Sequence, residues 1–342
     1  MGGAPGIARV ILFGWRVTVA AIVLALLQAA AGVAATAFFP VEQVSPGLVG
    51  YGLTVVEGTR IDRFEVEVLG LVKAAGPAGD LVLVRVEGPA VEAFGGIAAG
   101  MSGSPVYVDG KLLGAIGFAF EFSDHSVGLV TPIGDMVEVL RRVPDARPAG
   151  PTSTVRAQPR STAEVSSEPA PLQPVLFQRV AFAADEKTAQ KLAELAPAGT
   201  AVMVPVSTPV MLSGFGPRAQ QAIRRLLSPY RLLFVPAGGV VPVGVGGAPG
   251  GQAVTLEPGS AFGVSLVHGD VNLTAIGTVT YVDGSRFVGF GHPFLQKGTV
   301  DFFAGPAYIH RTVKSLSVPF KVGRMLGEPR AVLSEDRRAA VA

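Results

Sequence analysis

Apolar and polar residues alternate over several short runs in the first third of the chain. In FEVEVLG, the apolar residues Phe64, Val66 and Val68 are separated by single glutamates. A period of two places neighbouring side chains on opposite faces of a strand, so this run predicts a half-buried antiparallel strand. The runs YGLTVV, DLVLVRV and SPVYVDGKLLGAIGFAF have similar character. We therefore expect residues 38–143 to be rich in β-structure.

Turn signals and a return of strand character complete the β pattern. Asp109-Gly110 lies between two strand-like runs, and Asp283-Gly284 does so in a second strand-rich segment at residues 253–342. Asp and Gly tolerate the positive φ of a type I′ turn, so each pair predicts a hairpin. The last residues, VLSEDRRAAVA, contain no clear closing element, and we expect the chain to be truncated there.

Three stretches have helical character instead. One is a short amphipathic stretch at about residues 135–142, and the others are DEKTAQKLAEL from Asp185 and PRAQQAIRRLL from Pro217. Proline at the first helical position suits its restricted φ. The last two helices predict an α+β insert at residues 175–252. Residues 144–174 are rich in Pro, Ser, Thr and Ala without apolar periodicity, which predicts a linker.

Composition narrows the functional classes. With 342 residues, of which 49% are hydrophobic, the chain can bury a large core. The net charge is only +2 and the basic residues form no block, which argues against nucleic acid and favours a protein or peptide partner. The chain has no cysteine, which excludes disulfides, a cysteine nucleophile and thiolate metal sites.

The amino terminus has the pattern of an export signal. Arg9 and Arg16 precede the apolar run VTVAAIVLALLQAAAGVAA, and an A-x-A sequence ends at Ala37. This order is typical of a signal peptide, here residues 1–37. The run is also nearly long enough to cross a bilayer, so the alternative is an uncleaved membrane anchor. Either way, we expect the rest of the chain in the periplasm or outside the cell.

The candidate chemistry centres on GMSGSP at residues 100–105. A serine hydroxyl is a weak nucleophile unless a base removes its proton, and acyl transfer also needs N–H groups aimed at the developing oxyanion. Glycines around a serine let the backbone fold closely enough to supply them. The competing interpretation is a glycine- and serine-rich turn between two strands.

Two blocks resemble known serine peptidases. GMSGSPVYVDGKLLGAIGFAF resembles the nucleophile segment of trypsin-like serine peptidases, and about residues 50–140 resemble more closely the SpoIVB family of serine peptidases. TAIGTVTYVDGSRFVGFGHPF is similar to the segment around that family's catalytic histidine. The resemblance implies a mainly β fold, a trypsin-like double β-barrel with a small α+β insert. Residues 38–143 would carry the serine and residues 253–342 the histidine.

The resemblance also implies roles for single residues. It makes Ser102 the nucleophile and His292 the base, while Ser104 becomes a neighbour. The N–H groups of Gly100 and Ser102 would form the oxyanion hole. The strand that would run beside the substrate backbone, with an apolar preference for the substrate's P1 side chain, consists of Gly117, Phe118 and Ala119.

The sequence departs from the family pattern in two respects. The family's histidine segment precedes its serine segment, whereas here the order is reversed, as in a circular rearrangement; triads occur in several chain orders. Gly88 stands where the family has its aspartate. The candidates for the missing acid are Asp301, Glu87 and Asp80. A Ser-His dyad without an acid would retain some activity.

These features predict an exported serine endopeptidase that works through an acyl-enzyme. The alternative is a catalytically weak or inactive protein of the same fold that binds peptides or acts as a scaffold in the cell envelope, and the missing aspartate favours it. No cofactor or metal ion is expected, because the four acidic and histidine residues that could gather lack zinc-motif spacing; they are His268, Asp270, His292 and Asp301.

Overall fold

The computed structural model describes residues 36–73, 77, 79–120, 124–143, 179–197, 199–236 and 254–342. The chain divides into two units, Met1–Ala37 and Phe38–Ala342, and the second holds all the elements named below. Most of the predicted signal or anchor and all of the predicted linker lie outside the described residues. Within those residues, no helix is both long and apolar enough to cross a membrane.

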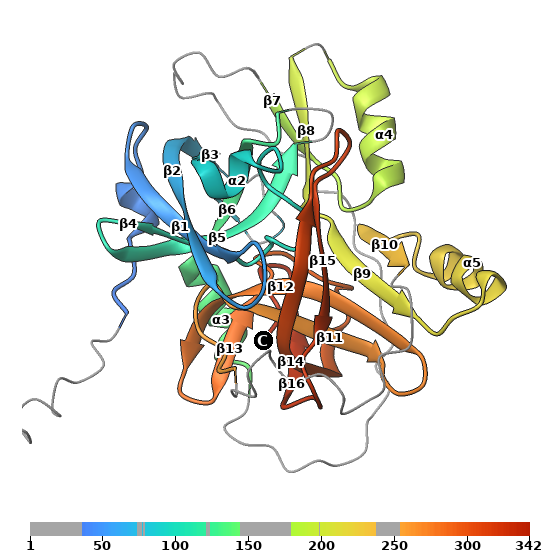
Figure 1. Ribbon diagram of the computed structural model, residues 1–342. Helices are drawn as coiled ribbons and strands as arrows, with labels where there is room; N and C mark the ends of the chain where they lie inside the picture. Colours follow the sequence, from blue (N-terminus) through green and yellow to red (C-terminus); the bar gives the residue numbers. More distant parts are fainter. Residues whose placement is uncertain are drawn as a thin grey trace, which may run out of the picture. The chain divides into compact units, whose positions relative to one another are not determined.

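Six antiparallel strands form a closed barrel in the first half (Figure 1). They are β1 (Val49–Val55), β2 (Ile61–Val72), β3 (Leu81–Glu87), β4 (Pro105–Val108), β5 (Lys111–Phe120) and β6 (Val127–Pro132). The order is β1-β2-β3-β6-β5-β4, and β4 pairs with β1 to close the barrel. Short helices accompany the strands: η1 (Val41–Gln43), α2 (Pro89–Glu92) and α3 (Ile133–Leu140).

The predicted period of two explains the barrel core. Phe64, Val66 and Val68 on β2 are all buried, in one apolar cluster with residues of β3, β4 and β5. Burying each such side chain contributes about 2 kcal/mol. The hairpin between β4 and β5 is also confirmed, since Asp109 has φ 50° and Gly110 has φ 72°. Alternation and turn chemistry together therefore build the barrel.

The second half holds a nearly closed barrel (Figure 1). Its strands are β9 (Thr208–Ser213), β10 (Leu232–Pro236), β11 (Ala261–Val267), β12 (Asn272–Asp283), β13 (Arg286–Gly289), β14 (Gly298–Val313), β15 (Phe320–Met325) and β16 (Ala331–Asp336). The order is β10-β9-β12-β11-β14-β15, with β13 on β12 and β16 on β14. These two barrels confirm the predicted trypsin-like double β-barrel.

The last residues are more ordered than the sequence suggests. They form β16, and beyond it Val341 makes a bridge with Gly289 at the end of β13. Ala339, Ala340 and Ala342 are buried against α3 and the first barrel's hairpin. These contacts are to strands far away in the chain, so the local sequence does not reveal them.

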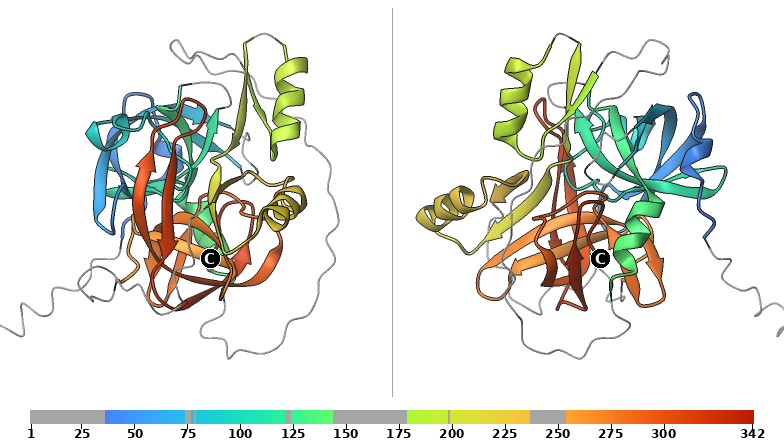
Figure 2. Two further views of the ribbon diagram at one scale, coloured as in Figure 1. Left: turned by 45° about the vertical axis from the view of Figure 1, so that its right-hand side comes forward. Right: turned by 180° about the vertical axis from the view of Figure 1, so that it is seen from behind.

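The segment between the barrels adds strands to both sheets. It contains β7 (Arg179–Phe182), α4 (Glu186–Leu195), β8 (Thr200–Pro205) and α5 (Pro217–Leu226). Both predicted helices are present, and Asp185 caps α4 by accepting the backbone N–H of Thr188. Strand β8 pairs with β5 of the first barrel, whereas β9 and β10 belong to the second. Figure 2 shows α4 beside β7 and β8, and α5 beside β10.

Candidate active site

The GMSGSP loop connects α2 to β4 and depends on its glycines. Gly100 and Gly103 have φ of 93° and 92°, a region that residues with a Cβ rarely adopt. A Cβ on Gly103 would lie 1.9 Å from the carbonyl oxygen of Thr278 and 2.5 Å from the backbone nitrogen of Phe290. Only glycine allows the loop to approach the second barrel this closely.

Strand β12 of the second barrel holds the loop through three hydrogen bonds. The backbone N–H of Thr278 donates to the Ser102 carbonyl at 2.9 Å, and its hydroxyl donates to the Gly100 carbonyl at 2.9 Å. The hydroxyl of Thr280 donates to the Gly103 carbonyl at 2.7 Å. The candidate nucleophile is thus fixed by residues almost 180 positions away in the sequence.

The backbone N–H groups of Gly100 and Ser102 each lie opposite a carbonyl that is held by a hydrogen bond. A trans peptide directs its C=O and N–H to opposite sides. The Ala99 carbonyl is held by the backbone N–H of Lys321 at 3.0 Å, so the following N–H of Gly100 points the other way. The Met101 carbonyl is held in the same manner by Ser104 at 2.9 Å, which directs the N–H of Ser102.

Among the described residues, neither of these N–H groups has an acceptor. The N–H of Met101, which lies between them, instead donates to the Ala98 carbonyl at 2.9 Å. An oxyanion hole needs fixed donors that are free to bind the developing charge. The N–H groups of Gly100 and Ser102 meet both requirements, because hydrogen bonds fix the carbonyls of their peptides and the two N–H groups have no acceptor among the described residues.

His292 lies on a tight turn after β13 that carries backbone strain. Phe290 has φ 66°, unusual for a residue with a side chain, and Gly291 has φ 67°. The ring of Phe290 stacks on His292 with centroids 5.7 Å apart, and Phe118 of β5 meets the imidazole edge-on at 6.3 Å. The hydroxyl of Thr131 on β6 donates to the Gly291 carbonyl. Both barrels therefore hold this turn.

The hydrogen bond of His292 defines its tautomer. Nδ1 lies 2.7 Å from the carbonyl oxygen of Pro293. A carbonyl only accepts, so Nδ1 carries the proton and Nε2 keeps its lone pair. Burial, with a smaller contribution from the charge of Arg231, lowers the pKa of His292 to about 4, although the hydrogen bond to Pro293 opposes this change. The imidazole is therefore neutral near pH 7 and has the form that a general base requires.

The structure brings Ser102 and His292 to one interface without a hydrogen bond between them. Ser102 is fully buried and His292 is 2% exposed. The Ser102 hydroxyl and Nε2 of His292 both lack a hydrogen-bond partner in the described part of the chain. Phe290 connects them, since its backbone touches Gly103 and its ring stacks on the imidazole. Catalytic hydrogen bonds are often longer before substrate binds.

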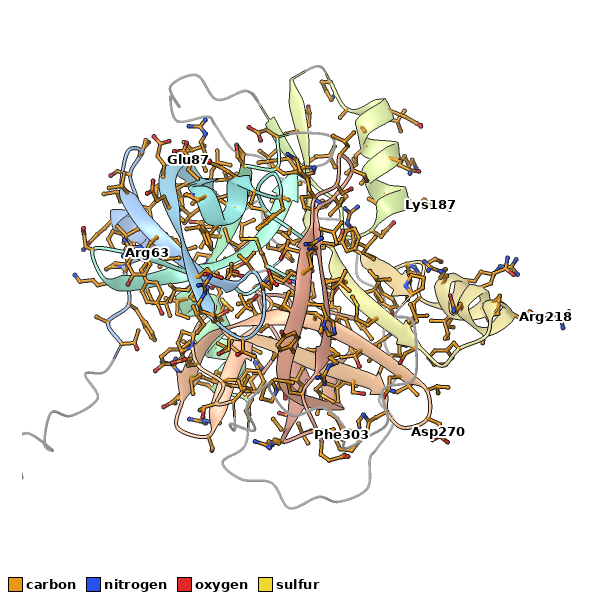
Figure 3. All side chains as sticks on the ribbon, viewed as in Figure 1. Arg63, Glu87, Lys187, Arg218, Asp270 and Phe303 are labelled. Carbon is orange, nitrogen blue, oxygen red and sulfur yellow. The ribbon has the colours of Figure 1, made fainter. Side chains whose placement is uncertain are left out.

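The three candidates for the acid of the triad do not contact His292. Asp301 is exposed on β14, Glu87 is exposed at the end of β3 on the periphery of the first barrel (Figure 3), and Asp80 is half-buried just before β3. None of their carboxylates bonds to His292, whose Nδ1 binds a backbone carbonyl instead. Among the described residues, no contact between Asp301 and His292 supports a catalytic role for Asp301, which stays a prediction.

A different carboxylate, which was not predicted from the sequence, organises the turn after His292. Asp336 at the end of β16 is fully buried. It accepts backbone N–H groups from Phe294 at 2.9 Å, Leu295 at 2.8 Å and Lys297 at 3.2 Å. Burial raises the pKa of Asp336, although these hydrogen bonds oppose the rise. In the sequence, only its place after an apolar run, in VLSED, could have marked it.

The edge of β5 predicted to bind substrate is paired with the protein's own β8. Phe118 lies opposite Pro205 and Ala119 opposite Val204, in antiparallel register. The backbone N–H of Val206 donates to the Gly117 carbonyl at 2.9 Å. An extended substrate would add to a strand edge through the same backbone groups. In this structure, β8 occupies that position.

The double barrel and the glycine-bounded serine loop define the class of trypsin-like serine peptidase folds. Within this class, residues 35–137 match the family model of SpoIVB peptidase S55. The match covers all six strands of the first barrel, includes the GMSGSP loop, and supports a serine peptidase. No curated protein and no solved structure matches the chain. Across the described ranges, no group of three or more His, Cys, Asp or Glu side chains could hold a metal ion.

Proposed function

We propose that this protein is an exported serine endopeptidase in which Ser102 is the nucleophile and His292 the general base. The observation that carries the proposal is the pair of N–H groups, of Gly100 and Ser102, that flank the hydrogen-bonded N–H of Met101. A turn that only connects two strands gives no reason for two N–H groups without acceptors beside the hydrogen-bonded carbonyls of Ala99 and Met101. An acyl-transfer site requires such free and fixed donors to bind the oxyanion.

The reaction follows from the tautomer of His292. Nε2 takes the proton of the Ser102 hydroxyl while Oγ forms a bond to the scissile carbonyl carbon, and the N–H groups of Gly100 and Ser102 bind the resulting oxyanion. The imidazolium then gives the proton to the leaving amine as the C–N bond breaks. Water, activated by the same nitrogen, hydrolyses the ester and frees Ser102.

The Pro293 carbonyl takes the place of an acid at Nδ1. It orients the ring and selects the tautomer, the two tasks that an aspartate performs in a complete triad. A neutral carbonyl stabilises the imidazolium less than a carboxylate does. We therefore expect slow turnover, because the buried ring of His292 must become charged during the reaction.

The occupied edge of β5 favours a second candidate function. With β8 paired to Ala119 and with both Ser102 and His292 buried, the structure describes a closed site. A protein that stayed closed would keep the peptidase fold without turnover and act as a peptide-binding or scaffold module of the cell envelope. The two candidates differ in whether Ser102 reacts.

Fluorophosphonate labelling of the purified full chain tests the proposal. The wild type and Ser104→Ala should be labelled, since Ser104 belongs to the same loop but is not the nucleophile. Ser102→Ala should lose all labelling, and His292→Ala should lose at least a factor of about 100, the contribution of a general base. Labelling of Ser102→Ala would contradict the assignment. An unlabelled wild type would favour the scaffold.

A further inference from the structure

A fully buried lysine lies directly beneath the nucleophile loop. Lys321 is the second residue of β15 and has no exposed surface. Its Nζ donates to the hydroxyl of Thr54 on β1 at 2.8 Å and lies 3.4 Å from the hydroxyl of Thr278 on β12. Among the described residues, no carboxylate comes within salt-bridge distance of Nζ. Burying a cation is costly without such a partner, so stability alone gives no reason for a lysine here.

The backbone and stem of Lys321 both contact the segment that leads to Gly100. Its N–H donates to the Ala99 carbonyl at 3.0 Å, and the N–H of Ala99 donates back to Pro319 at 2.7 Å. A Cβ on Gly100 would lie 3.2 Å from Cδ of Lys321. The peptide between Ala99 and Gly100, which carries the Gly100 N–H, therefore rests on this lysine.

The ammonium group acts on the next peptide through Thr278. The Thr278 hydroxyl has a single hydrogen, which it donates to the Gly100 carbonyl at 2.9 Å. Toward Lys321 that hydroxyl can only accept, so Nζ is the donor in their contact. The donation from Nζ orients the hydroxyl toward Gly100. The two peptides on either side of the Gly100 Cα are thus held by Lys321, one directly and one through Thr278.

We propose that Lys321 is a positioning residue, which acts through Thr278 and Ala99 to aim the Gly100 N–H at the oxyanion. The inference rests on the proposed peptidase function. Burial lowers the pKa of Lys321 to about 7, while the charge of Asp62 opposes this change. Neither threonine partner carries a charge that would hold it protonated.

The test compares how each variant changes kcat and the labelling rate, which report on the transition state, with how it changes KM, which reports on substrate binding. Lys321→Met keeps the length of the side chain and removes the donor, while Thr278→Val removes only the hydroxyl that reaches Gly100. In each, kcat and the rate of fluorophosphonate labelling should fall about tenfold, a fraction of the loss seen when an oxyanion donor is deleted. KM for a peptide amide should stay within about twofold, because the donor acts on the tetrahedral state.

A peptide aldehyde gives a second readout. Its adduct with serine carries an oxyanion-like oxygen, so its inhibition constant should rise about tenfold in both variants while KM does not change. The double variant should be no worse than the poorer single one, because the two groups act in series. Thr274→Val, the same change elsewhere on β12, is the control and should leave all values unchanged.

The outcomes separate this inference from the peptidase assignment. An unlabelled wild type overturns both. A labelled wild type with unchanged kcat in Lys321→Met and Thr278→Val overturns the role of Lys321 alone, as does an equal rise in KM and in the aldehyde constant. If Lys321→Met fails to fold, Thr278→Val decides by itself, because valine preserves the shape of threonine and the backbone N–H that holds Ser102.

Discussion

The carboxylate of Asp336 accepts the backbone N–H of Leu295 at 2.8 Å, three residues after the candidate base. The same carboxylate also binds the N–H groups of Phe294 and Lys297. This turn contains strained backbone at Phe290, so it needs contacts that hold it in place. Asp336 therefore fixes the backbone that directly follows His292, without touching the imidazole.

We predict that Asp336→Asn destabilises the protein and reduces labelling of Ser102. An amide presents one oxygen and one NH₂ group, so at least one backbone N–H would face a donor instead of an acceptor. The free energy of unfolding should fall by roughly 3 kcal/mol, measured by urea denaturation. Asp283→Asn, which removes only an exposed ion pair with Arg286, should change it by less than about 1 kcal/mol. Equal losses in the two variants would contradict the role of Asp336.

Gly103→Ala should prevent the two barrels from meeting at the nucleophile loop. The added Cβ would lie 1.9 Å from the Thr278 carbonyl oxygen, and φ at this position is 92°. Backbone on both sides must then move, at a cost of more than about 4 kcal/mol. Gly110→Ala is the matched control: φ is 72° there but no atom lies within 4 Å, so about 1 kcal/mol of backbone strain is the only cost. Thermal unfolding of both variants measures the difference, and similar midpoints would contradict the close approach.

Stability should fall as the pH is lowered through the titration range of His292. The folded pKa is about 4 and the ordinary value is 6.5, so between these values the unfolded chain binds more protons. The contribution of His292 is fully present above pH 6.5 and is lost as the pH falls toward 4, a change of about 3 kcal/mol. Urea denaturation of the wild type and of His292→Leu across this range isolates the effect. Parallel curves for the two proteins would show that the imidazole is not buried as described.

Removing one backbone donor should loosen β8 from the substrate edge. The N–H of Val206 bonds to Gly117, and Val206→Pro eliminates it while Val206→Ala keeps it. If β8 blocks substrate, the proline variant should be labelled and should cleave peptides several times faster than the alanine variant. Steady-state cleavage of a peptide library measures this. Equal rates would indicate that β8 is a permanent part of the sheet and that substrate binds elsewhere.

The sequence by itself determined the local elements and the candidate chemistry. The alternation around Phe64 and Val66 specifies a strand because side-chain direction along a strand depends only on nearest neighbours. Asp109-Gly110 specifies a hairpin because backbone φ is a property of the residues themselves. The serine motif was visible for the same reason, since its glycines lie beside it. The role predicted for Asp301 is of another kind, because it concerns a partner far from the motif.

Only the tertiary structure decided which distant groups meet that motif. Thr278 binds Gly100 across 178 positions, Asp336 holds the turn of His292, and Lys321 rests under the loop. The local pattern around Thr278 and Lys321 does not mark them, and that around Asp336 offers only a preceding apolar run, since a buried lysine or aspartate is distinguished from an exposed one by what packs over it. Likewise, the pairing of β8 with β5 depends on which strand edges remain open after the barrel closes. That is a property of the whole fold, and no single segment carries it.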